Sequence, residues 1–168
     1  LEAEPTNPMY IKHRALLANE SDDIQKAITL LKTIQFAKET PEAPLLLAVA
    51  LRNERKYAEA IQILNEFLKR KPPSQLQEEA SRLLIQLHLD NKDIENAKKI
   101  FNSTTASDPS NIFNLVNGAR ISKHSGKSGD AISLLKKAKR YLDHRATFRQ
   151  LMEVANEFYF LKQFLTIS

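Results

Sequence analysis

The sequence of 168 residues contains no cysteine, few glycines and no long apolar run. Without cysteine the chain has no disulfide, no thiol nucleophile and no cysteine-ligated metal. Only three glycines, together with the lack of strand-like alternation, favour an all-helical fold. No apolar stretch reaches the length of about 18 residues that predicts a membrane span, and no signal-peptide pattern opens this stretch. The sequence therefore assigns no compartment, and the bacterial periplasm and the cytoplasm are both allowed.

Residue patterns typical of catalysis, metal binding and cofactor binding are missing as well. The four histidines are His13, His88, His124 and His144. None is spaced from another as metal ligands are, and we expect His88 to be packed in the core. The string HSGKSG at 124–129 resembles a phosphate loop, but Ile121 stands where that loop needs its first glycine. We interpret the string as a turn between helices, and we predict no enzyme, no metal and no cofactor.

The sequence does contain a repeat of about 34 residues. Four alanines occur at intervals of 33, 37 and 34 residues, and a large apolar residue follows each of them four positions later. The alanines are Ala27, Ala60, Ala97 and Ala131, and the apolar residues are Leu31, Leu64, Phe101 and Leu135. Pro72 and Pro109 close two of the repeats. A helix–turn–helix unit of this period is the signature of tetratricopeptide-type arrays.

On these residues the chain resembles the tetratricopeptide repeat family over nearly all of its length. The first helices match less closely than the second. Leu47, Ala48 and Leu51 fit the family's pattern, but Gly118 stands where leucine is usual. The resemblance implies an all-α fold, a right-handed α-solenoid of about four helix–turn–helix repeats plus a terminal helix. We expect the four alanines to be buried where paired helices approach closely.

The predicted organisation is a flexible lead-in at 1–7 followed by a single superhelical domain at 8–168. Its repeats span 8–40, 41–74, 75–109 and 110–145, with a partial fifth repeat at 146–168. The predicted helix pairs are 8–21 with 22–38, 41–54 with 57–70, 75–89 with 93–106, and 110–124 with 128–142. Ser21, Asp22 and Asp23 supply N-cap chemistry for the second of these helices, because a short side-chain oxygen accepts from the free amides of a helix start.

The C-terminal segment carries the apolar spacing of another first helix. Leu151, Val154, Phe158 and Leu165 share one stripe, so we expect Phe158 to face the core with the others. Phe160 and Phe164 lie on the opposite side and are expected to be exposed. This arrangement favours a missing neighbour, so we interpret the chain as a fragment whose partners include adjacent repeats of a longer parent chain.

Function is expected on the inner face, which the first helices of such arrays line. By analogy with the family, the partner-binding residues are Lys12, Asn19, Leu45, Val49, Arg52, Arg82, Gln86, Val116, Arg120 and Lys123. Arginine forks suit carboxylates, so an acidic protein or peptide is the expected partner, contacted by Arg82 and Arg120.

Three functions fit these observations. The leading hypothesis is a non-catalytic scaffold that binds another protein or peptide in its groove. The alternative is a periplasmic module of a bacterial envelope or exopolysaccharide export complex, which would recruit a soluble enzyme. Nucleic-acid binding through a basic groove ranks last. The net charge is +5, but the basic residues are scattered among 20 acidic ones without interleaved aromatics, which favours an ordinary solvated surface.

Overall fold

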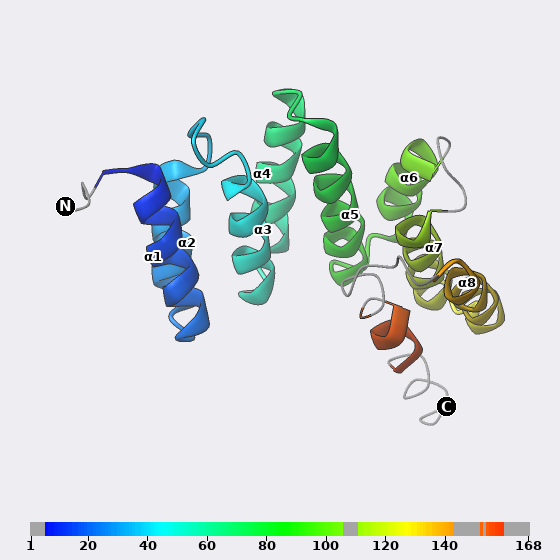
Figure 1. Ribbon diagram of the computed structural model, residues 1–168. Helices are drawn as coiled ribbons and strands as arrows, with labels where there is room; N and C mark the ends of the chain where they lie inside the picture. The colour runs from blue at the N-terminus through cyan, green and yellow to red at the C-terminus, as the bar shows by residue number, and fades with distance from the viewer. Residues whose placement is uncertain (1–5, 106–110, 143–151, 153, 160–168) are drawn as a thin grey trace. The chain divides into compact units, whose positions relative to one another are not determined.

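The computed structural model describes residues 6–105, 111–142, 152 and 154–159, and this part of the chain contains helices and no strand. The helices with defined bounds are α1 (Pro8–Glu20), α2 (Ile24–Ile34), α3 (Ala43–Asn53), α4 (Tyr57–Lys69), α5 (Ser74–Asp90), α6 (Ile94–Thr105), α7 (Ile112–His124) and α8 (Ser128–Tyr141) (Figure 1). Residues 154–159 are also helical. Each bound lies within four residues of its predicted position, so the predicted order of these helices is confirmed.

The chain forms two compact units, Leu1–Asn91 and Lys92–Ser168. In the first unit α1 packs against α2 and α3 against α4, while α2 also contacts α3 and α4 contacts α5. Neighbouring helices of this unit therefore lie side by side in chain order (Figure 1). In the second unit α7 packs against both α6 and α8. The predicted limits of the individual repeats remain a prediction.

The turns inside the repeats all use the same backbone conformation. Three residues separate α1 from α2, α3 from α4, α5 from α6 and α7 from α8. The middle residue is left-handed in every case, with φ of 61° at Asp22, 59° at Arg55, 61° at Lys92 and 74° at Gly126. After Asp22, Arg55 and Gly126 the next N–H bonds back across the turn, as from Lys56 to the Leu51 carbonyl at 2.9 Å, which is the Schellman termination of a helix. Asp23 then caps α2, as predicted, by accepting from the Lys26 N–H.

The four repeat alanines are buried, which confirms the expected register. Ala27, Ala60 and Ala97 are 0% exposed and Ala131 is 1% exposed. Each follows the left-handed residue of its turn by five positions, so the turn and the buried alanine keep one register along the chain. The largest buried side chains of the first unit include Leu47, Leu51 and Leu64. The core of the second unit is formed by Ile112, Leu115, Val116, Ala119, Ala131, Leu135, Ala138 and Val154.

Gly118 departs from the family pattern because neighbouring side chains occupy the space that a leucine would need. A Cβ atom placed on Gly118 would lie 3.2 Å from Phe101 Cζ and 3.3 Å from Leu134 Cδ1. Both distances are shorter than the usual separation of about 3.5–4.0 Å between carbon atoms in contact. The Phe101 ring of α6 and the Leu134 side chain of α8 therefore meet over the bare backbone of α7.

The C-terminal expectations are met where the structure describes the residues concerned. Val154 is buried in the core of the second unit, and Phe158 is partly buried and packs against that core. The expectations for Leu151, Phe160, Phe164 and Leu165 concern positions outside the described residues.

Candidate functional site

The expected partner-binding residues come from the first helix of each repeat. In the first unit these helices are α1, α3 and α5. Two ion pairs connect them, because Lys12 Nζ lies 2.7 Å from Glu42 Oε1 and Arg52 Nε lies 2.5 Å from Asp90 Oδ2. We call the surface that these helices present the first-helix face, and its residues are Lys12, Leu16, Asn19, Val49, Arg52, Arg82 and Gln86.

The pair Lys12–Glu42 joins the middle of α1 to the residue that precedes α3. Partial burial by itself raises the pKa of the Glu42 carboxyl. The hydrogen bond from Lys12, a backbone hydrogen bond and the Lys12 charge together outweigh that effect, so the net pKa of Glu42 lies below its usual value. The Lys12 side chain is only 14% exposed, because its stem lies against the protein and its ammonium group meets the carboxylate.

Arg52 connects α3 to α5 through two bonds. Besides the contact between Nε and Asp90, its Nη1 donates to Gln86 Oε1 at 3.1 Å. The side chains of Arg52 and Asp90 are 36% and 29% exposed, so water and a partner both reach them. A guanidinium group carries five N–H donors, and the bonds found in the described part of the chain use two of them.

Arg82 is less accessible than Arg52. Its Nη2 lies 3.5 Å from Glu79 Oε1 on the preceding turn of α5, and its side chain is 11% exposed. Arg82 therefore offers little exposed surface to a partner carboxylate, and it already lies beside a carboxylate of the chain itself.

Arg120 of α7 repeats the arrangement of Arg52 within the second unit. Its Nε lies 2.5 Å from Glu157 Oε1, and its Nη1 donates to the buried Asn117 Oδ1 at 3.3 Å. Both members of this pair are covered, at 16% and 13% exposure. The acid follows the arginine by 38 residues at Arg52 and by 37 at Arg120, close to one repeat length. Lys123, one turn after Arg120, is partly exposed.

The apolar residues of the expected site divide into two groups. Leu45 and Val116 are 6% and 0% exposed, so they belong to the interior and present no surface to a partner. Val49 is 42% exposed, and Leu16 is 38% exposed at the corresponding position of the preceding repeat. Asn19, one turn after Leu16, is exposed as well.

Sequence reasoning found the basic residues of this surface but missed the acids that pair with them. Glu42, Asp90 and Glu157 each meet a cation of the expected site. The signal available in the sequence was the recurrence of an acid about one repeat after the basic residue. The expected basic column is therefore largely neutralised by the chain itself.

Other kinds of site find no support in the described residues. Among them, no group of three or more histidine and acidic side chains could hold a metal ion. The described helices also include none long and apolar enough to cross a membrane. His88 is 9% exposed, as expected of a core histidine.

Comparisons with known proteins bear on the fold. No protein-family model matches the sequence, and no curated protein matches it. The solved structure of MamA 41-end from Desulfovibrio magneticus RS-1 is similar at a TM-score of 0.63 and 16% identity, over 95% of each chain. The thermophilic TPR protein TTC0263 from Thermus thermophilus is similar at a TM-score of 0.67 and 14% identity, over 91% of this chain and 82% of that one.

PilF of Pseudomonas aeruginosa gives a TM-score of 0.56 at 16% identity, over 91% of this chain and 68% of that one. At such identities these likenesses show the fold, which is an all-α helical-repeat solenoid of the tetratricopeptide type.

Proposed function

We propose that this chain is a non-catalytic protein-interaction scaffold that binds an extended segment of a partner protein on its first-helix face. The observation that carries the proposal is the exposure of Leu16 and Val49, which occupy corresponding positions on successive first helices. Aliphatic side chains in water forgo about 1.5–3 kcal/mol of possible burial each. We take these two side chains, at corresponding positions on successive first helices, as a short apolar row that a bound peptide would cover.

Polar groups beside this row would orient the bound segment. Arg52 is held in place by Asp90 and Gln86, so its unused N–H donors are already positioned for a carboxylate or a carbonyl oxygen. Asn19 lies exposed near the apolar row and supplies both a donor and an acceptor. A partner segment that combines an aliphatic side chain with an acidic one fits this chemistry.

The remaining members of the expected site contribute less in this proposal. Lys12 and Arg82 are mostly covered and paired, so their role is to hold the face in shape. In the second unit the corresponding contacts would come from Arg120 and Lys123, and Arg120 is likewise paired. The fold supports the proposal, because extended binding surfaces are the common use of helical-repeat arrays.

Selection from a randomised peptide library displayed on phage tests this proposal without a known partner. Enriched peptides should contain an aliphatic residue next to an acidic one, and their affinity should fall about tenfold for Leu16→Ser or Val49→Ser. Leu17→Ser is the matched control, because Leu17 is 62% exposed on the same helix but lies about 100° around it from Leu16.

Retention of affinity in Leu17→Ser with loss in the other two variants supports the first-helix face. Equal binding by all three variants, or no enrichment of any peptide, would refute the proposed face. Circular dichroism of each variant shows whether the helices are intact.

A further inference from the structure

Helix α8 carries an unusual concentration of positive charge. Lys136, Lys137, Lys139 and Arg140 fall within five residues and are all exposed, and Asp130 in the first turn is the only acid of the helix. Within the residues that the structure describes, none of these four cations has an ion pair or a hydrogen bond.

Each of the other second helices has a surface cation at or near it that pairs with an acid of the chain. Lys32 of α2 pairs with Glu59 at 2.6 Å, Arg70 after α4 lies 3.6 Å from Glu66, and Lys98 of α6 pairs with Glu95 at 2.8 Å. Acids of the chain thus neutralise many cations elsewhere, including Arg52 and Arg120. Across the described part of the chain, the α8 cluster stays uncompensated.

The helix dipole accounts for only part of this cluster. Cations in the last turn of a helix are favourable, which suits Lys139 and Arg140. Lys136 and Lys137 lie one turn earlier, where that effect has largely decayed.

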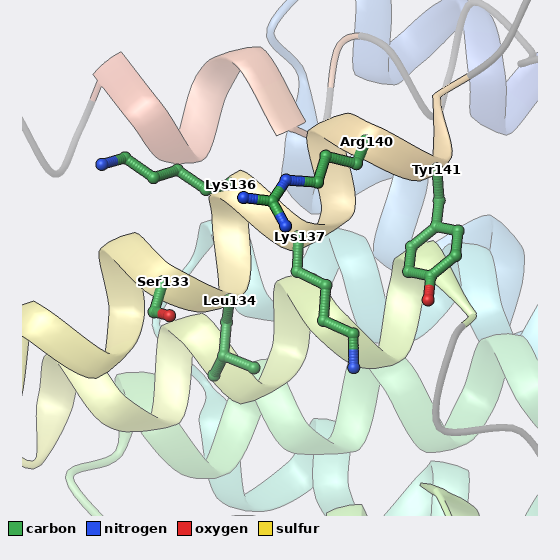
Figure 2. Close-up of a pocket in the computed structure, with 6 residues that line it drawn as sticks. All are labelled: Ser133, Leu134, Lys136, Lys137, Arg140 and Tyr141. Carbon is green, nitrogen blue, oxygen red and sulfur yellow. The ribbon is translucent and has the colours of Figure 1, made fainter.

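A surface pocket of about 430 Å³ lies against the same helix. It is lined by Ser133, Leu134, Lys136, Lys137, Arg140 and Tyr141. In Figure 2, Lys137 and Tyr141 extend toward the same side of α8, while Lys136 points away from Tyr141. Leu134 and the Tyr141 ring, which is 47% exposed, give the pocket an apolar wall beside its cations.

We propose that this α8 pocket is a second docking site, which takes an acidic peptide segment of a partner protein with an aliphatic side chain next to its carboxylates. The carboxylates would pair with Lys136, Lys137 and Arg140, and the aliphatic side chain would lie against Tyr141 and the stem of Lys137, on the same side of α8 as Leu134 (Figure 2). Charge complementarity supplies the argument for the acidic occupant. The site goes beyond the proposed function, because it shares no residue with the first-helix face.

The make-up of the pocket favours a peptide over single-stranded nucleic acid. Proteins that bind single strands stack successive bases on several aromatic side chains. Among the described residues that line this pocket, Tyr141 is the one aromatic, and Leu134 supplies the rest of the apolar wall. An aliphatic surface next to cations matches a side chain such as leucine flanked by glutamates.

Three labelled probes of equal net charge separate the possible occupants by fluorescence anisotropy. The first is a peptide of repeated Glu-Glu-Leu units, the second replaces each leucine by serine, and the third is an oligothymidylate. The Glu-Glu-Leu peptide should bind the full chain about tenfold more tightly than the serine peptide, because leucine adds apolar contact. Equal or tighter binding of the oligothymidylate would overturn the proposal in favour of nucleic acid.

Two adjacent charge reversals locate the site. Arg140→Glu should weaken binding of the Glu-Glu-Leu peptide about tenfold, whereas Lys139→Glu makes the same change in net charge outside the pocket and should weaken it far less. Tyr141→Ser should remove the preference for leucine over serine. All of these variants are also measured in a chain that carries Leu16→Ser and Val49→Ser, where peptide binding to the first-helix face is removed, and the same differences in that background keep this test independent of that face. Equal losses of affinity in Arg140→Glu and Lys139→Glu would show that the peptide is held by diffuse charge attraction, and they would refute the proposed site.

Discussion

Replacement of Gly118 by leucine, the residue usual at this position in the family it resembles, should destabilise this chain. The side chain would enter the space where Phe101 and Leu134 already meet, since even a Cβ atom would lie 3.2 and 3.3 Å from them. Overpacking of this kind costs about 1–3 kcal/mol. Leucine also improves helix propensity over glycine by about 0.8 kcal/mol. The net expectation is a loss of about 1 kcal/mol in the free energy of unfolding.

Two further variants test the cause of that loss. Gly118→Ala adds only the Cβ atom, so the gain in helix propensity and the small overlap should nearly cancel, within about 0.5 kcal/mol of the original chain. In a Phe101→Ala background the ring is gone and Gly118→Leu fills its space. There the substitution should raise stability, with a coupling energy of about 1–3 kcal/mol.

Urea unfolding followed by circular dichroism at the helix band gives the stability differences needed for this cycle. The dependence of the unfolding free energy on urea concentration must be compared along with the urea midpoints, because repeat arrays can lose two-state behaviour. Identical effects of Gly118→Leu in both backgrounds would show that Phe101 does not set the space at Gly118, and the reasoning would then be wrong. A rise in stability in the original background would refute it equally.

Two more predictions concern the first unit. Glu42→Gln should lower stability at neutral pH, and because the pKa of Glu42 is below its unfolded value, this difference should be full above about pH 4.3 and vanish as the pH falls through the folded pKa. Urea midpoints from pH 7 to pH 3 check this, and a difference that persists unchanged to the lowest pH would contradict it. Ala60→Leu should cost about 1–3 kcal/mol in the same assay because Ala60 is fully buried in α4, which packs against α3. Ala58→Leu on the exposed side of α4 should stay within about 0.5 kcal/mol, and equal losses for both would count against the assigned register.

The helices could be predicted from the sequence because one physical constraint recurs. An alanine such as Ala60 is needed wherever two helices approach closely, and its period locates both helices of the repeat. From the sequence alone, Gly118 was an unexplained exception to the family's pattern. Its explanation requires knowing that Phe101 occupies the space above it, which is a contact between residues on different helices.

The candidate site was predictable only in part, for a related reason. Periodicity places Leu45, Val49 and Arg52 on one helix, but it does not say which of them a neighbouring helix covers. The structure buries Leu45 and leaves Val49 exposed. It also gives Arg52 a partner, Asp90, that lies 38 residues away in sequence. Long-range pairing of this kind depends on how helices stack and not on any local pattern.

Each left-handed turn residue precedes its alanine by five positions in the sequence, and this fixed distance along the chain decides where a change of length is tolerated. One residue inserted between Arg55 and Ala60 would rotate the alanine by about 100° around α4 and remove it from the contact with α3. The chain's own irregular interval, 37 instead of 34 residues, leaves that distance intact and is accompanied by an α5 of 17 residues, the longest of the first helices. Pro73, just before α5, therefore marks a border at which duplication or exchange of whole repeats would keep each turn residue five positions before its alanine.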